Sequence, residues 1–160
     1  MTMPHMRMIM CALALIALTS MSCSSSKPPK ATFIATLEAR DAADAAVQTS
    51  FMRGETTLFR LRIRWTGRSP TTAGQLFPSL MVANSGGEQV WSQSLGAIPE
   101  AQEWQPGQEK TWDFTWADQH PEGSVTPAAA GRYRATVNNL SNLSPEGPQP
   151  LDFDIVAGSG

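Results

Sequence analysis

The sequence predicts an all-β protein, an antiparallel β-sandwich of immunoglobulin type with about seven to eight strands. Apolar and polar residues alternate in most runs between residues 31 and 156, which is the pattern of strands with one buried face. Turns that contain glycine or proline separate these runs at short intervals. With 41% hydrophobic and 16% charged residues, the 160-residue chain has enough apolar side chains for one core. A small open β-barrel is the alternative arrangement of the same strands.

The first alternating run is residues 33–37, and the clearest is residues 59–65, in which four apolar side chains alternate with three arginines. Residues 41–48 lie between them and have the alanine-rich composition of a short helix. Every second residue of 45–51 also fits a strand. We expect a short strand here that ends near Arg53.

Turn signals mark the remaining strands. The sequence Asn84-Ser85-Gly86-Gly87 lies between residues 80–82 and 89–91 and indicates a β-hairpin. Pro106-Gly107 predicts a type II turn before residues 110–116, which place three aromatic side chains on one face. Prolines precede the two last runs, at residues 132–137 and 151–155.

The two faces of the alternating strands predict the inside and the outside of the sandwich. Arg60, Arg62 and Arg64 share one face, which we expect to be solvated and paired with Asp and Glu of neighbouring strands. Contact with an acidic partner or with lipid headgroups is the alternative. The opposite faces are expected to pack into one core that includes Leu61, Ile63, Trp65, Trp112, Phe114, Trp116 and Tyr133.

The N-terminal segment predicts export and membrane attachment. Arg7 precedes an apolar run of ten residues, 9–18, which has the length of a signal-peptide core and is too short to span a bilayer. Ser22-Cys23 follows and resembles the lipobox of bacterial lipoproteins. This resemblance implies a signal peptide at 1–22, a lipidated Cys23 at the head of a tether over 23–30, and a folded domain over 31–157. An ordinary secretory signal is the alternative.

The region from residue 56 to 140 resembles the BsuPI-type intracellular proteinase inhibitor domain. The motifs that carry the resemblance are Pro106-Gly107, the aromatic strand that contains Trp112 and Trp116, and Gly131-Arg132-Tyr133. The resemblance implies an immunoglobulin-like sandwich that binds a protease. Ala128-Ala129-Ala130 lengthens a segment that is shorter in that family, and the export signal departs from an intracellular target. Tyr133 after Gly131 is also typical of a tyrosine corner, a structural hydrogen bond from the hydroxyl to upstream backbone.

The composition excludes several function classes. Two histidines and two cysteines are too few for zinc fingers or a disulfide scaffold, and a net charge of −2 does not favour nucleic-acid binding. Without residues 1–22, His120 is the only histidine left for acid–base chemistry. No nucleophile motif, phosphate loop or dinucleotide fingerprint is present. The sequence therefore predicts no catalytic residue, no metal ligand and no cofactor.

The remaining hypotheses concern binding. Trp104 lies in a loop-like context, Glu103-Trp104-Gln105-Pro106, and we expect it to be partly exposed and to contact a partner together with Gln105 and His120. Covering one end of the sandwich is the alternative role for Trp104. The sequence thus favours a membrane-anchored, non-catalytic protein-binding module, which the resemblance specifies as a proteinase inhibitor. A structural or assembly component of the cell envelope is the alternative, and a glycan-binding module that uses Trp104 is a weaker one.

Overall fold

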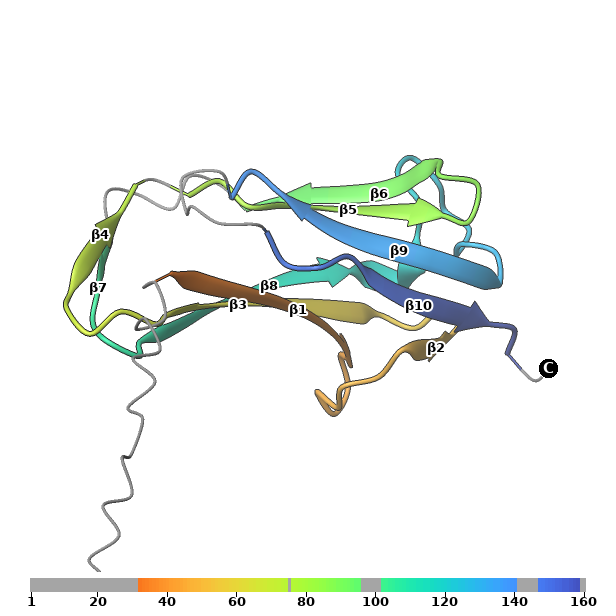
Figure 1. Cartoon of the computed structure of the whole chain (residues 1–160). Helices are drawn as coiled ribbons and strands as arrows, with labels where there is room; N and C mark the ends of the chain where they lie inside the picture. Colours follow the sequence, from red (N-terminus) through yellow and green to blue (C-terminus); the bar gives the residue numbers. More distant parts are fainter. Residues whose placement is uncertain (1–31, 75, 96–101, 141–146, 159–160) are drawn as a thin grey trace, which may run out of the picture.

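The computed structural model describes residues 32–74, 76–95, 102–140 and 147–158. The expected signal peptide, Cys23 and the tether lie outside these residues. Within them the chain forms two facing sheets and a short strand pair at one end (Figure 1). This arrangement confirms the all-β, immunoglobulin-like sandwich, and no sheet closes into a barrel.

The three-stranded sheet has the order β1-β3-β8, and the five-stranded sheet has the order β2-β10-β9-β5-β6. All pairings are antiparallel except that of β2 with β10, which is parallel. The strands of the first sheet are β1 (Phe33–Asp41), β3 (Thr57–Trp65) and β8 (Glu109–Trp116). Those of the second are β2 (Ser50–Met52), β5 (Ser79–Asn84), β6 (Gln89–Ser94), β9 (Gly131–Asn138) and β10 (Leu151–Val156). The separate pair is β4 (Thr71–Ala73) and β7 (Gln102–Trp104).

Aromatic rings from both sheets form the centre of the core. Phe59 of β3 and Phe153 of β10 pack edge to face with their centroids 5.5 Å apart. Trp116 and Tyr133 do the same at 6.0 Å, and all four side chains are buried. Edge-to-face contacts of this kind add to the hydrophobic contribution of the buried rings. Trp65 and Trp112 are half-buried at the border of this core.

The outer faces carry the predicted charge pairs. Arg60 donates two hydrogen bonds of 2.8 Å to the Asp113 carboxylate across β3 and β8, and Arg62 lies 3.2 Å from Glu38 of β1. The hydrogen bond from Arg60 lowers the pKa of Asp113. The arginine stripe is therefore a solvated sheet face with ion pairs, as the alternation predicts.

The segment between β1 and β3 differs from the prediction. Asp41 accepts hydrogen bonds from the backbone of Ala43 and Ala45, and Ala45 has a φ of 59°. Aspartate side chains favour such turns over regular structure because they bond nearby backbone N–H groups. The strand is consequently confined to β2, of which only Phe51 is buried, while Val47 is 59% exposed.

Both predicted turns are present. Gly87, with a φ of 82°, closes the β5–β6 hairpin through its N–H to Asn84 C=O, the geometry of a type I turn with a glycine bulge. Gly107 has a φ of 74°, and Gln108 N–H donates to Gln105 C=O across the Pro106-Gly107 turn. A positive φ at this third turn position is the mark of a type II turn.

Candidate functional site

The sandwich has two ends that differ in what they expose (Figure 1). At the first, the Trp104 end, β1 begins, β3 ends, and the β4–β7 pair covers the core. The second, the Tyr133 end, consists of the end of β8, residues 117–130, the start of β9 and the β5–β6 turn. The described chain begins at Thr32, which forms hydrogen bonds with Thr66 at the Trp104 end.

Trp104 is fully buried, so the prediction that it is partly exposed is wrong. Its ring packs against Phe33 at 5.2 Å and Trp112 at 6.4 Å, and Lys110 lies over it at 4.4 Å. The sequence context resembled a loop because β7 is only three residues long and pairs with β4, which is too short to produce an alternating pattern. Gln105 is exposed and its backbone N–H donates to the side chain of Gln108, so it belongs to the turn. The Trp104 end therefore offers no exposed indole at this position, either for a protein or for a glycan.

At the Tyr133 end, residues 117–130 form one long connection that we call the anchored loop. The loop begins with the 3-10 helix η1 (Ala117–Gln119), and its principal anchor is Gln119, a fully buried polar side chain. Gln119 Oε1 accepts from Gly54 N–H at 3.0 Å, and Nε2 donates to Thr57 Oγ1 at 3.3 Å. Its carbonyl accepts from Ala128 N–H at 2.9 Å, which ties the two ends of the loop together. A buried amide with all these partners is costly to remove, since each partner would be left unsatisfied.

Further hydrogen bonds hold the loop to the sheets. Trp116 Nε1 donates to His120 C=O at 2.7 Å, so His120 shapes the loop through its backbone, and its side chain is half-buried. Arg53 Nε donates to Ala128 C=O at 3.1 Å. Tyr133 donates its hydroxyl to Ala129 C=O at 2.7 Å, the tyrosine corner that the sequence predicts. Burial raises the pKa of Tyr133, which keeps this hydroxyl protonated as a donor.

The tip of the loop is ordered although it projects into solvent. Ser124 N–H donates to Pro121 C=O across a turn in which Gly123 has a φ of 74°. The Ser124 hydroxyl bonds both the N–H and the C=O of Thr126. Between them Val125 is 90% exposed, the largest exposed fraction among the large apolar side chains that the structure describes. The loop therefore presents one apolar side chain on a supported backbone.

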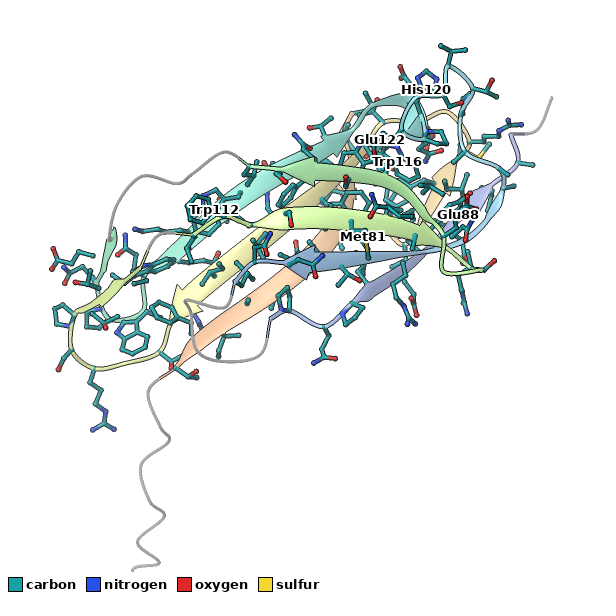
Figure 2. All side chains as sticks on the ribbon, turned by 90° about the horizontal axis from the view of Figure 1, so that it is seen from above. Met81, Glu88, Trp112, Trp116, His120 and Glu122 are labelled. Carbon is teal, nitrogen blue, oxygen red and sulfur yellow. The ribbon has the colours of Figure 1, made fainter. Side chains whose placement is uncertain are left out.

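The same end of the sandwich carries exposed carboxylates. Glu88, Asp118 and Glu122 are exposed, and in the described part of the chain none of the three forms a salt bridge. Figure 2 shows Glu88 and Glu122 at the same end of the molecule as His120 and Trp116. Arginines lie at the same end: Arg134 makes a bidentate ion pair with Asp152, and Arg53 donates to the carbonyls of Pro127 and Ala128 in the loop itself. The Tyr133 end thus carries carboxylates and arginines together with the exposed Val125.

A shallow groove lies beside the loop. It consists of two adjoining depressions of about 280 and 360 Å³ between the β5–β6 turn and the start of β9. Asn84, Ser85, Arg132 and Tyr133 line both depressions. The groove is open and mixed in polarity, and it enlarges the recessed area next to the projecting tip.

Within the described residues, the structure contains no group of three or more His, Cys, Asp or Glu side chains with the spacing of a metal site. The described part of the chain also contains no helix that is long and apolar enough to cross a membrane. The anchored loop and the groove beside it are the projecting and recessed parts of the Tyr133 end, and we take them as the candidate site.

Comparisons with known proteins identify no family for this chain. No family model matches the chain, and no curated protein matches it. Similar solved structures include a β-glucosidase from Listeria innocua in complex with glucose (TM-score 0.49, 15% identity). This match covers 81% of the present chain, which spans 16% of the β-glucosidase. A CARDB domain from Pyrococcus furiosus is 16% identical, with a TM-score of 0.40; the match covers 79% of the present chain and 93% of that domain. The C-terminal domain of Wzt is 12% identical, with a TM-score of 0.44; the match covers 82% of the present chain and 80% of that domain. Likenesses at this level carry no argument about activity or ligand.

The contact residues predicted from the sequence do not include Val125 and Gln119, the two residues that define the site. Val125 had a recognisable signal, because it is the one large apolar residue in a Pro- and Gly-rich stretch that shows no strand alternation. Gln119 had no such signal in the sequence. Its burial becomes evident only from its hydrogen-bond partners, such as Gly54 and Thr57, which lie far away in the sequence.

Proposed function

We propose that this chain is a membrane-anchored, non-catalytic protein-binding module, and that the anchored loop is the surface that it presents. The observation that carries the proposal is Val125, an almost fully exposed apolar side chain on a loop held by a buried glutamine. Binding through a pre-ordered loop loses little conformational entropy, which is a large part of the cost of association. Apolar side chains at the centre of a polar rim are also the usual energetic focus of an interface.

The charges define the partner. Glu88, Asp118 and Glu122 are exposed at the same end as Val125, and they favour a partner surface with basic groups and a small apolar recess for Val125. Charge complementarity of this kind increases the association rate and depends on ionic strength.

The direction of the chain determines how the proposed membrane anchor would orient the domain. The described residues begin at the Trp104 end, and the anchored loop lies at the opposite end (Figure 1). A lipid on Cys23 would therefore place the membrane at the Trp104 end and leave the loop facing outward.

The resemblance to the BsuPI-type inhibitor domain favours a peptidase as the partner. A loop that offers a valine matches peptidases whose specificity pocket takes small aliphatic side chains. Structural support for the inhibitor role is the rigidity of the loop, which hydrogen bonds provide where no disulfide is present.

The test compares two exposed valines. Val125→Asp should weaken capture of the native partner by about 30-fold, the effect of one interface hot spot. Val47→Asp is the matched control, because Val47 is also exposed but lies outside the anchored loop. Both variants should unfold at the temperature of the unmodified protein. Equal capture by Val125→Asp and the unmodified chain would contradict the assignment of the loop.

A peptidase panel separates inhibition from binding in general. Peptidases that prefer small aliphatic, large apolar and basic residues are each assayed with the full chain and with Val125→Asp. Inhibition of the first class alone, lost in the variant, is the expected result. Partner capture without inhibition of any peptidase would refute the inhibitor role and leave the binding role in place.

A further inference from the structure

The five-stranded sheet has two edge strands, the three-residue β2 and the longer β6, which pairs only with β5 in the described structure. Its residues, Gln-Val-Trp-Ser-Gln-Ser, include no charge and no proline. Charges and prolines are the means by which proteins protect sheet edges from additional strands. The edge strands of the other sheet, β1 and β8, both carry such charges. The edges of β6 and β8 lie near each other, since Thr115 N–H of β8 donates to Gln93 Oε1 of β6 at 3.0 Å. Of these two edges, that of β6 is the one without charged residues.

The hydrogen-bond ladder determines which backbone groups of β6 are free. Leu95 N–H donates to Pro78 C=O at 3.1 Å, next to the ladder between β5 and β6. The direction of the backbone N–H and C=O groups alternates along an antiparallel strand. The N–H and C=O of Gln93, two residues before Leu95, therefore point toward β5 as the N–H of Leu95 does. Ser92 and Ser94 occupy the alternate positions, and their N–H and C=O groups point away from the sheet.

One position of this edge already has a backbone partner. Glu122 N–H, from the anchored loop, donates to Val90 C=O at 2.7 Å. Val90 lies two residues before Ser92, in the direction of the Tyr133 end. The edge therefore accepts main-chain hydrogen bonds, and the position that is filled is the one next to the candidate docking loop.

We propose that the β6 edge receives an extended segment of the partner protein, which adds a strand beside Ser92 and Ser94. This inference rests on the proposed binding function and specifies how the partner docks. Strand addition obtains affinity from main-chain hydrogen bonds and specificity from the flanking side chains. Here the flanking charges are Glu88 and Glu122 at one end of an otherwise uncharged strand. The segment is consequently uncharged along β6 and carries Lys or Arg where it passes these carboxylates.

A second copy of this chain fits the edge less well. Two β6 strands paired antiparallel by a two-fold axis would have their long axes reversed. The Trp104 ends, at which both chains enter their sandwiches, would then face opposite directions. Two copies anchored in one membrane through Cys23 cannot adopt this arrangement, whereas an extended segment of another protein can.

The probe is a synthetic hexapeptide, acetyl-Lys-Thr-Val-Thr-Val-Thr-amide, added to the full chain with Cys23→Ala in detergent. Nuclear magnetic resonance follows amide exchange at each residue. In the free protein the Ser92 and Ser94 amides should exchange fast and the Gln93 amide slowly. Saturating peptide should slow Ser92 and Ser94 by about tenfold, and replacing its lysine by glutamate should weaken binding about threefold. Slow exchange of Ser92 and Ser94 in the free protein would overturn the proposal.

Proline substitution is the selective variant. Ser92→Pro removes an outward N–H and no bond to β5, so the fold should persist while peptide binding is lost. Ser92→Ala is the matched control and should bind normally. Ser94→Pro repeats the test at the other free position and serves where Ser92→Pro lowers the melting temperature. Unchanged peptide binding in both proline variants would refute strand addition.

The same variants distinguish this inference from the docking loop itself. Val125→Asp should bind the peptide normally and capture the partner about 30-fold more weakly. If Val125→Asp weakens capture and the proline variants do not, the loop is the docking surface and the β6 edge is not part of it.

Discussion

The two ends of the sandwich contain similar sequence elements and use them in opposite ways. At the Trp104 end an apolar residue beside a Pro-Gly turn is completely buried, and at the Tyr133 end Val125, beside a Pro-containing turn, is 90% exposed. The difference in burial arises from the residues that contact each of these two segments. Phe33 and Trp112 provide a site for the Trp104 ring, whereas the hydrogen bonds of Gln119 fix the loop so that Val125 points away from the core. Similar turn sequences therefore give a core element or a docking surface according to their tertiary partners.

The largest effect should come from Trp104. Trp104→Ala is expected to lower the free energy of unfolding by about 3–5 kcal/mol, because it removes a fully buried ring from the core. Val125→Ala should change it by less than about 0.5 kcal/mol, as is usual for an exposed position. Urea denaturation of both variants measures the contrast. A similar loss of unfolding free energy in the two variants would contradict the distinction between a buried residue at one end and an exposed residue at the other.

The next effect concerns the anchor of the loop. Gln119→Ala leaves Gly54 N–H without its acceptor and Thr57 without its donor, at a cost of about 1–3 kcal/mol. Gln105→Ala is the matched control at the other end and should be nearly neutral, since Gln105 is exposed. Hydrogen exchange should also accelerate in residues 117–130 of the Gln119 variant. Unchanged exchange there would show that other contacts suffice to order the loop.

A smaller effect is expected from the tyrosine corner. Tyr133→Phe removes the hydroxyl that donates to Ala129 C=O and keeps the ring in the core. The loss of one hydrogen bond should cost about 1 kcal/mol. Thermal unfolding of the variant checks this value, and a loss above about 3 kcal/mol would mean that the ring itself has moved.

The smallest effect lies between the ends, in the ion pair of Arg60 and Asp113. The hydrogen bond from Arg60 lowers the folded-state pKa of Asp113 below its unfolded value of about 3.9. The pair therefore stabilises the fold above that pH, and its contribution is lost as the pH falls through the folded pKa. Because the carboxylate is 39% exposed, the contribution should be no more than about 1 kcal/mol. The free energies of unfolding of Asp113→Asn and of the unmodified chain should differ at pH 7 and become equal in acid. A difference that stays constant with pH would show that the substitution acts through packing and not through the ion pair.

The sequence predicts the strands well because period two reports directly on burial. The alternation of residues 59–65 placed Leu61 inside and Arg62 outside, as the structure has them. The alternation pattern does not predict the structure where local hydrogen bonds or tertiary contacts determine the conformation. The turn of residues 41–46 depends on Asp41 and Asp44 carboxylates that bond nearby N–H groups. The burial of Trp104 depends on a partner, Phe33, that is distant in sequence.

The candidate site was only partly predictable for the same reason. Pro121-Glu122-Gly123 indicates a turn, and the tyrosine corner follows from Gly131 and Tyr133. The support of the loop, however, comes from Gln119 and its contacts with the turn before β3. No local pattern reports such a contact, because it joins residues more than sixty positions apart.

The most direct test of the central claim is photocrosslinking from each end of the sandwich. A photoreactive amino acid is placed at Val125 or at Phe77, which is 44% exposed and follows β4 of the Trp104 end. The full chain is then irradiated in its native membrane. We expect a discrete protein adduct from Val125 and none from Phe77. An adduct from Phe77 with none from Val125 would contradict the assignment of the anchored loop as the docking surface.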